Sequence, residues 1–461
     1  MPLLYEDFHS KINFNKRLAR AHVNKRKKGR STMSTRDKRS WVTLAVVCLA
    51  VCTSVTVSAR SVASPEPDYH YSGQVQIDDQ SGRIRADWQI TIYDESESEI
   101  TFYLRDTLGD IEVTGPGITE VITEKQSGFG DFWAISVKLA DLSAESPGRQ
   151  RTVQISYEGV LLPEPMENLI NTIEPGRVEL NVDSFWFPID SRFSKILTAE
   201  LAVHVGEGWQ GVTTGNAIAI EDGFRLVNTD PRLDIAFTLS KSFYITRAEG
   251  FTVFDQRAAH DGTAQLIDTA SRCRSFLNTR FGAEDPLPAG KLLITARKSS
   301  GYSRENYIVF TDISDTEPGP LMRFVCHEFA HYWSQGAKFD TVDNWLNEAF
   351  AEYIGLMAVR EYLGQGAYDE MLASFGVQIA GLGLPRIWKV GDSERGQELV
   401  QYRKGPLVLA RLERTIGRAA FLEFIQTYFK SPDKTTPGLL RVLAGVAGPQ
   451  HAKSFEVMLG E

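Results

Sequence analysis

The segment FVCHEFAHYWSQG (Phe324–Gly336) carries two histidines four residues apart, with a glutamate directly after the first. On a helix, residues i and i+4 share a face, so His327 and His331 can direct two ring nitrogens at one point. Zinc needs that convergence, because its bonds to nitrogen are only about 2.0–2.1 Å long. Glu328 is offset around the helix, beside such a metal, where it can hold a water molecule. By itself the motif is only a hypothesis, since an ordinary helix with two polar residues near the surface also fits it.

A third ligand is expected further along the chain, because catalytic zinc takes three protein ligands and leaves one position open. Glu348, in DNWLNEAFAEYIG, lies 17 residues after His331 and near the start of the next expected helix. If that helix packs antiparallel to the first, it returns Glu348 to the metal. Glu352 is one turn further on the same face, and is either a rival ligand or a hydrogen-bond partner for a histidine N–H. Apolar neighbours favour burial of this helix, where an unpaired carboxylate would be costly.

The segments HEFAH and WLNEAFAEY together resemble the zinc-binding core of the aminopeptidase N and leukotriene hydrolase family of gluzincin metallopeptidases. The chain has sixteen residues between His331 and Glu348, two fewer than the family pattern, and Ala349 where the family usually has glycine. The resemblance implies one Zn²⁺ ion held by His327, His331 and Glu348, with Glu328 as the general base and a peptide as the substrate.

Two further segments match the same family. QYRKGPLVLARL resembles its Y-E-K-G segment, which implies that the hydroxyl of Tyr402 stabilises the tetrahedral oxyanion; a core tyrosine at a helix start is the alternative. GYSRENYIVF resembles its G-x-M-E-N segment, which implies that Glu305, with Asn306, binds the free α-amine of the substrate. Arg304 replaces the family's methionine, and a loop Glu305 paired with Arg304 is the alternative interpretation.

The flanking sequence indicates the elements that must position these residues. From 71 to 247, apolar and polar residues alternate and break at Asp, Ser and Gly turns, which predicts many short strands. From 248 to 461 the spacing becomes helical, with a strand expected at GKLLITAR. Helices are expected around Asp261–Gly282, Phe324–Gln335, Trp345–Leu363 and Lys404–Ile416, and in the last segment of the chain.

The predicted fold class is therefore α+β: an N-terminal all-β saddle or sandwich domain (71–247) followed by an α-rich catalytic domain (248–461). The resemblance implies that the second domain is thermolysin-like. DSFWFPID (Asp183–Asp190) and the strand DIAFTLSKSF also resemble segments of the family's N-terminal saddle domain. The chain ends about 60 residues after Tyr402, so the family's helical C-terminal domain is expected to be missing.

The charge of the chain is unevenly distributed. The net charge is −9, yet residues 1–40 carry twelve Lys/Arg against three acids, which leaves a strongly acidic body. An acidic body argues against nucleic acid as a partner, because phosphate binding needs a positive face. The sequence contains neither a P-loop nor a convincing dinucleotide fingerprint, so no nucleotide cofactor is predicted.

Behind the basic segment comes an uncharged stretch of 19 residues, Trp41–Ala59, followed by a linker at 60–70. It is typical of a signal peptide that ends in small residues, and it is also long enough to be a membrane anchor. A signal peptide that starts at Met33 would have an ordinary length. One interpretation is therefore that translation starts at Met33 and that residues 1–32 are an artefact of the assigned start codon. We expect export to the periplasm or the extracellular space, or a membrane-anchored protein with its catalytic body outside the cytoplasm.

Outside this stretch the body contains only Cys273 and Cys326. Two cysteines do not make a disulfide framework; a single bridge in an oxidising compartment is one interpretation, and two small buried residues is the one we favour.

The sequence thus predicts a zinc metallopeptidase, an aminopeptidase acting on peptides. The alternatives are an endopeptidase on the same scaffold and a non-catalytic, membrane-anchored binding protein with an idle zinc site. The joint presence of Glu328 and Tyr402 speaks against the last, since binding alone needs neither. Side-chain preference and oligomeric state are not readable from the sequence.

Overall fold

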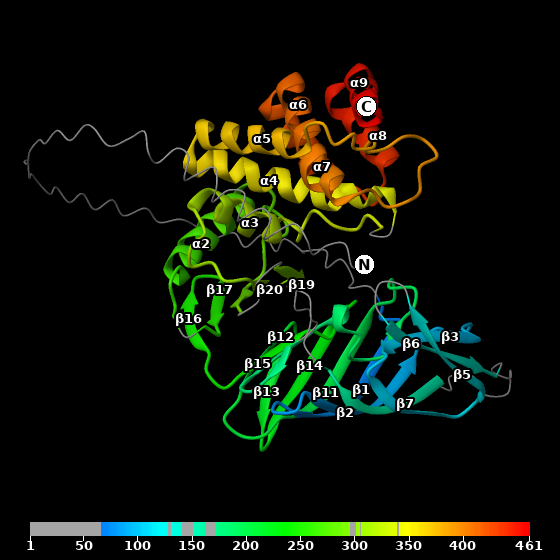
Figure 1. Ribbon diagram of the computed structural model, residues 1–461. Helices are drawn as coiled ribbons and strands as arrows, with labels where there is room; N and C mark the ends of the chain where they lie inside the picture. The colour runs from blue at the N-terminus through cyan, green and yellow to red at the C-terminus, as the bar shows by residue number, and fades with distance from the viewer. Residues whose placement is uncertain are drawn as a thin grey trace, which may run out of the picture.

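The computed structural model describes two domains, one rich in strands and one rich in helices (Figure 1). This is the α+β architecture expected from the change of periodicity near residue 250. The described residues are 66–127, 131–140, 151–161, 172–257, 259–295, 301–304, 306–338 and 341–461. The basic segment, the stretch Trp41–Ala59 and most of the 60–70 linker lie outside them. Among the described residues, no helix is long and apolar enough to cross a bilayer.

Alternating burial organises the first domain into three sheets. In β1 (Tyr69–Asp78) and β2 (Arg83–Ile92), apolar side chains such as Tyr71, Ile84 and Ile90 point to one buried face. The largest sheet has the order β13-β14-β11-β1-β2-β7-β4, and two four-stranded sheets have the orders β10-β3-β6-β5 and β12-β15-β9-β8.

The remaining strands of these sheets are β3 (Glu99–Arg105), β4 (Leu108–Thr114), β5 (Ile118–Ser127), β6 (Asp131–Leu139), β7 (Arg151–Val160), β8 (Thr172–Glu174), β9 (Arg177–Leu180), β10 (Ile189–Asp190), β11 (Leu197–His204), β12 (Gln210–Thr213), β13 (Asn216–Ile220), β14 (Gly223–Arg232) and β15 (Phe237–Ser240).

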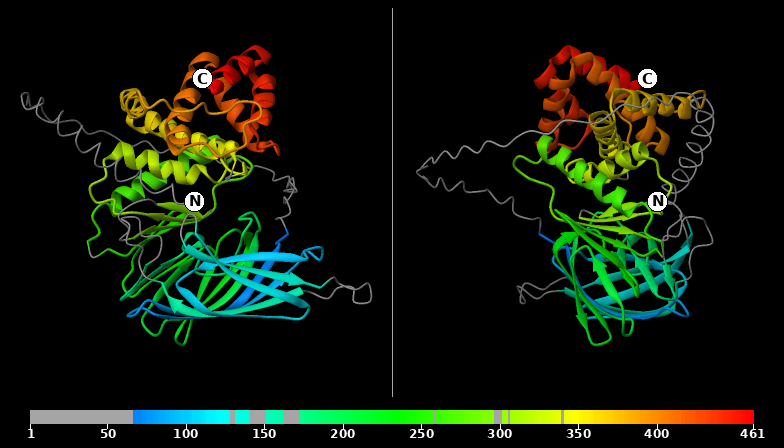
Figure 2. Two further views of the ribbon diagram at one scale, coloured as in Figure 1. Left: turned by 45° about the vertical axis from the view of Figure 1, so that its right-hand side comes forward. Right: turned by 90° about the vertical axis from the view of Figure 1, so that its left-hand side faces the viewer.

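The second domain begins with a five-stranded sheet of order β16-β17-β18-β20-β19. β17 (Phe251–Asp255), β18 (Gly290–Ile294) and β20 (Tyr307–Phe310) run parallel. β16 (Tyr244–Ala248) and β19 (Tyr302–Arg304) are antiparallel edge strands. β16 therefore pairs into this sheet, although all its residues but Ala248 were expected in the first domain. Figure 2 shows this sheet between the sheets of the first domain and the helices.

The helices of the second domain are α2 (Thr263–Arg280), α3 (Pro318–Ala330), α4 (Trp345–Leu363), α5 (Gln365–Ile379), α6 (Gly405–Ile416), α7 (Arg418–Lys430), α8 (Thr436–Ala447) and α9 (Pro449–Gly460). The expected helix Trp345–Leu363 has the bounds of α4. α3 begins six residues before the expected Phe324, because Pro318 at its first turn suits a helix start. α5 was not predicted.

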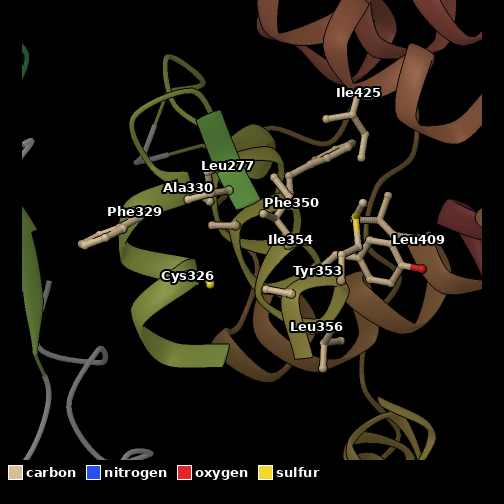
Figure 3. Packing of buried hydrophobic residues seen from close by; sticks show 14 of the residues in the cluster. Leu277, Cys326, Phe329, Ala330, Phe350, Tyr353, Ile354, Leu356, Leu409 and Ile425 are labelled. Carbon is tan, nitrogen blue, oxygen red and sulfur yellow. The ribbon is translucent and has the colours of Figure 1, made fainter. Parts of the chain in front are cut away.

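The helices pack around α4, whose buried residues cover nearly its whole circumference. In Figure 3, Phe350 of α4 lies between Leu277 of α2 and Ile425 of α7, and Tyr353 of α4 points toward Leu409 of α6. A helix that is apolar on all sides is a central core helix, so α4 can hold a charged side chain rigidly.

Cys273 of α2 and Cys326 of α3 form a disulfide bond with a Cα–Cα distance of 5.2 Å. Both residues are fully buried. The favoured sequence interpretation, two unpaired buried cysteines, is therefore wrong. The bond ties α2 to α3 at the residue just before His327.

A seam joins the two domains through both apolar and polar contacts. A small buried cluster joins Val212 and Ala236 of the first domain to Leu293, Tyr307 and Val309 of the five-stranded sheet. The Lys291 ammonium donates to the backbone carbonyls of Thr213, at 2.7 Å, and Gly215. Burial lowers the pKa of Lys291 to about 8. The seam thus fixes how the strand-rich domain faces the five-stranded sheet.

Candidate active site

α3 and α4 hold the candidate metal ligands and lie very close together. A Cβ atom added at Gly355 of α4 would lie 2.5 Å from the Arg323 carbonyl oxygen of α3, so only glycine permits this approach. A Cβ at Gly405 would lie 2.6 Å from the Ala349 methyl. Gly405 therefore leaves room for the alanine that replaces the family's usual glycine.

The approach of the helices brings His327, His331 and Glu348 together, with one ligand atom from each within 4.8 Å of the others. The two Nε2 atoms lie 3.1 Å apart, and Glu348 Oε2 is 3.6 Å from each of them. His331 lies at the C-terminal end of α3, and Glu348 lies in the first turn of α4. The i, i+4 spacing on one helix and the turn back through α4 produce this convergence.

The other ring nitrogen of each histidine fixes its tautomer. His327 Nδ1 lies 3.0 Å from Glu352 Oε2, and His331 Nδ1 lies 3.3 Å from the Ser334 carbonyl oxygen. Both partners are acceptors, so each Nδ1 carries the hydrogen and donates it. In the neutral rings, both Nε2 lone pairs then face one another.

Two facing lone pairs beside a carboxylate repel one another unless a cation lies between them. Glu348 Oε2 is buried and has no hydrogen-bond partner among the described residues. An orphaned buried carboxylate oxygen is costly, and two imidazoles with a carboxylate are a donor set that zinc prefers. His327, His331 and Glu348 therefore fit a zinc ion.

Glu352 does not converge with these three ligand atoms. It contacts His327 through the Nδ1 atom, and not through the Nε2 atom that faces the site. Its Oε1 accepts hydrogen bonds from Arg323 and, at 3.0 Å, from Arg403. Burial alone would favour its protonation, but Arg323 and the hydrogen bond to His327 hold the pKa of Glu352 far below its usual range. Of the two sequence interpretations of Glu352, the geometry matches the hydrogen-bond partner.

Glu328 is 7% exposed and lies next to His327 on the helix. Burial raises its pKa, and the nearby His327 and His331 oppose that shift. A carboxylate in this setting holds a proton more readily than an exposed one, which suits a group that must accept and release protons.

Tyr402 lies in a single π-helical turn, Val400–Lys404, that precedes α6. The sequence predicted a helix from Lys404 and not this turn, whose extra residue is a feature often found at functional sites. The Tyr402 ring stacks on His327 with a centroid distance of 5.8 Å. Burial and the nearby Glu348 raise the pKa of Tyr402 well above its usual range, so the phenol keeps its proton and remains a donor.

Glu305 lies outside the described residues. Its neighbour Asn306 is half-buried; its backbone carbonyl accepts from Lys291 N–H at 2.6 Å, and its side-chain Oδ1 is buried without a partner among the described residues. Arg304 donates to Asp234 at 2.6 Å and to Asp183 at 3.1 Å. These two aspartates of the strand-rich domain therefore hold the residue that replaces the family's methionine.

A cavity of about 400 Å³ lies where the two domains meet. Its walls include Ser303 and Arg304 of β19, Gln335 just after α3, and Tyr71, Phe187 and Leu233 of the strand-rich domain. Gln335 follows the residue whose carbonyl oxygen orients His331. The cavity is large enough for a residue side chain.

Sequence reasoning missed Arg323 and Arg403, which surround Glu352. Both are cations beside a recognised motif, Arg323 one turn before His327 and Arg403 directly after Tyr402. Their positions were the only signal, because charged residues next to a helix motif are usually exposed.

Comparison with known proteins finds a family model that matches part of the chain and solved structures with a similar fold. Residues 301–439 match the model of the peptidase family M1 domain. The structure resembles an M1 zinc metallopeptidase from Deinococcus radiodurans, with a TM-score of 0.61 and 15% identity over 86% of this chain and 95% of that one. A mutant of the Deinococcus enzyme bound to a Tyr-Ser-Ala substrate gives a TM-score of 0.60 and 17% identity over 86% and 94%.

The structure also resembles the native LTA4 hydrolase of yeast, with a TM-score of 0.62 and 15% identity over 85% of this chain. The match covers 66% of the yeast enzyme. At such identities these likenesses establish the fold: a strand-rich domain followed by a helix-rich one, as in both enzymes.

Proposed function

This chain carries a peptidase family M1 domain, and from that premise we propose that the protein is a zinc-dependent aminopeptidase. The observation that carries the proposal is the convergence of the His327 and His331 Nε2 atoms with the Glu348 carboxylate, with Glu328 and Tyr402 beside them. A binding site alone would need neither the buried carboxylate nor the buried phenol. The peptide seen on the mutant Deinococcus enzyme supports a peptide substrate here.

His327, His331 and Glu348 would hold the zinc, which when bound acidifies a water molecule and polarises the scissile carbonyl. Glu328 takes the proton from the attacking water and passes it to the leaving amine. The Tyr402 hydroxyl donates a hydrogen bond to the oxygen that becomes negatively charged. Glu352 keeps the imidazole of His327 in the orientation and tautomer that bind the metal.

We assign to Glu305, with Asn306, the binding of the free α-amine of the substrate. The buried Asn306 Oδ1, which has no partner among the described residues, supports a polar ligand close to this position. The cavity beside β19 is suited to a substrate side chain.

Two measurements test the proposal. Peptides with a free N-terminus and their N-acetylated forms should differ sharply in kcat/KM, and Glu305→Gln should reduce that difference by raising KM for the free peptides only. Equal cleavage of both forms would instead indicate an endopeptidase. Glu328→Gln should lower kcat by at least about 10²-fold while leaving one zinc per chain, as measured by metal analysis; activity close to that of the unaltered protein would refute the mechanism.

We further propose that the protein acts outside the cytoplasm, exported or anchored through Trp41–Ala59. The disulfide between Cys273 and Cys326 supports an oxidising compartment, where such bonds persist. Mass spectrometry of the mature N-terminus tests this: cleavage near Ala59 indicates export, an intact N-terminus in the membrane fraction indicates an anchor, and an intact N-terminus in the soluble cytoplasmic fraction refutes both.

A further inference from the structure

We propose that Arg403 is a positioning residue that couples the two halves of the site. Through Glu352 it fixes the metal-binding histidine His327, and through its own backbone turn it places Tyr402. The coupling of these roles rests on the proposed peptidase function.

The link to the metal site runs through a single carboxylate. Arg403 is 1% exposed, and its Nη1 donates to Glu352 Oε1 at 3.0 Å. The other oxygen of Glu352 accepts from His327 Nδ1 at 3.0 Å. The position of the guanidinium therefore sets the position of the carboxylate, and the carboxylate sets the angle of the imidazole ring.

The link to Tyr402 is made by the backbone. Arg403 is the next residue in the π-helical turn, and its Nη1 also donates to the Tyr402 carbonyl oxygen at 2.8 Å. On its other side, Nε donates to Gln378 Oε1 at 2.5 Å, and the guanidinium lies 4.5 Å from the centre of the Phe375 ring. α5 therefore clamps the side chain of Arg403, and the clamped side chain holds the turn that carries Tyr402.

Arg323 offers a matched comparison within the same cluster. It also donates to Glu352 Oε1, and its guanidinium lies 5.9 Å from the same Phe375 ring. It belongs to α3, however, and not to the turn of Tyr402. Removing either guanidinium should shift the Glu352 carboxylate. Only the loss of Arg403 should also loosen the π-helical turn that carries Tyr402.

The experiment compares Arg403→Met and Arg323→Met, each alone and combined with Tyr402→Phe. The zinc dissociation constant is measured by competition with a chromophoric chelator, and kcat and KM are measured at saturating zinc. Both arginine variants should lose zinc affinity by roughly tenfold, the lower end of the loss that is usual when the direct partner of a metal ligand is removed, because each variant leaves Glu352 in place. Arg403→Met should also lower kcat by at least about tenfold with little change in KM, as expected when an oxyanion donor is displaced.

The double variants decide whether Arg403 acts through Tyr402. If it does, Arg403→Met adds little further loss of kcat once Tyr402→Phe has removed the hydroxyl. Arg323→Met should change kcat by the same factor with and without Tyr402→Phe. Arg403→Lys should recover zinc affinity better than kcat, because one ammonium cannot bond Glu352 and Gln378 in the fork geometry of a guanidinium.

Three results would overturn the proposal: an equal loss of kcat on Arg403→Met with and without Tyr402→Phe, unchanged zinc affinity in that variant, or a lower melting temperature as its only effect. If the unaltered protein bound zinc but cleaved no peptide, the proposed function would fail instead. The zinc affinities of the arginine variants would then test, without any activity measurement, whether Arg403 positions His327 through Glu352.

Discussion

Breaking the bond between Cys273 and Cys326 should destabilise the protein by an amount that follows from chain length. The two cysteines are 53 residues apart, and closing a loop of that length contributes about 4 kcal/mol through the entropy of the unfolded chain. A Cys→Ala change adds a packing loss of about 1 kcal/mol at each buried position. Each single variant should therefore lose about 5 kcal/mol, and the double variant only about 6 kcal/mol, because the bond can be lost only once.

The assay is thermal unfolding of Cys273→Ala, Cys326→Ala and the double variant. Spread over the roughly 360 described residues, losses of about 5 and about 6 kcal/mol correspond to melting temperatures lower by about 7 °C for the single variants and about 8 °C for the double variant. Peptide mapping without reductant should find the two cysteines in one linked fragment. The reasoning is refuted if the losses add, with about 1 kcal/mol for each single variant and about 2 kcal/mol for the double, because that is the behaviour of two unpaired thiols.

Further predictions concern the site and the seam. Glu328→Gln should lower kcat by roughly 10²–10⁴-fold at unchanged zinc content, as measured by metal analysis beside peptide hydrolysis. Tyr402→Phe should lower kcat by roughly 10²–10³-fold with little change in KM; a change confined to KM would contradict an oxyanion donor. Removing zinc with a chelator should abolish activity and lower the melting temperature, and adding zinc back should restore both. In Glu348→Ala, added zinc should restore neither. Burial raises the pKa of Asp234 to about 6, against the effect of Arg304, so the unfolded state binds fewer protons there. The stability from Asp234 is thus present below about pH 4 and lost as the pH rises to about 6, roughly 2–3 kcal/mol in all, and urea unfolding of Asp234→Asn should lack that slope.

The sequence was informative where geometry is local. His327 and His331 share a helix face because of the helical repeat alone. Glu348 reaches them as soon as the second helix packs antiparallel to the first, and the structure does bring the three residues together. The alternation of 71–247 predicted strands, but not which strands pair, because pairing is decided by contacts far apart in the chain. Tyr244–Ala248 shows this: most of it was expected in the first domain, but it pairs with β17 in the sheet of the second domain.

The parts that were missed depend on tertiary contacts. The buried position of Arg403 follows from the π-helical turn and from α5, neither of which the hydrophobic spacing indicates. The disulfide requires knowledge that the two cysteines lie 5.2 Å apart between Cα atoms, which no spacing of two residues can supply. The structural setting of Glu305 lies outside the described residues, so its assignment stays a prediction.

The seam between the domains determines which fragments of this chain can fold on their own. A catalytic fragment cut near residue 248 would expose Leu293, Tyr307 and Val309 to water and would leave Lys291 without its carbonyl partners. The complementary fragment would retain Asp234 without the arginine that neutralises it. We therefore expect the smallest autonomous folding unit to be the pair of domains, which should unfold in one cooperative step. Exchange of either domain with that of a relative should succeed only when the matching half of the seam is exchanged as well.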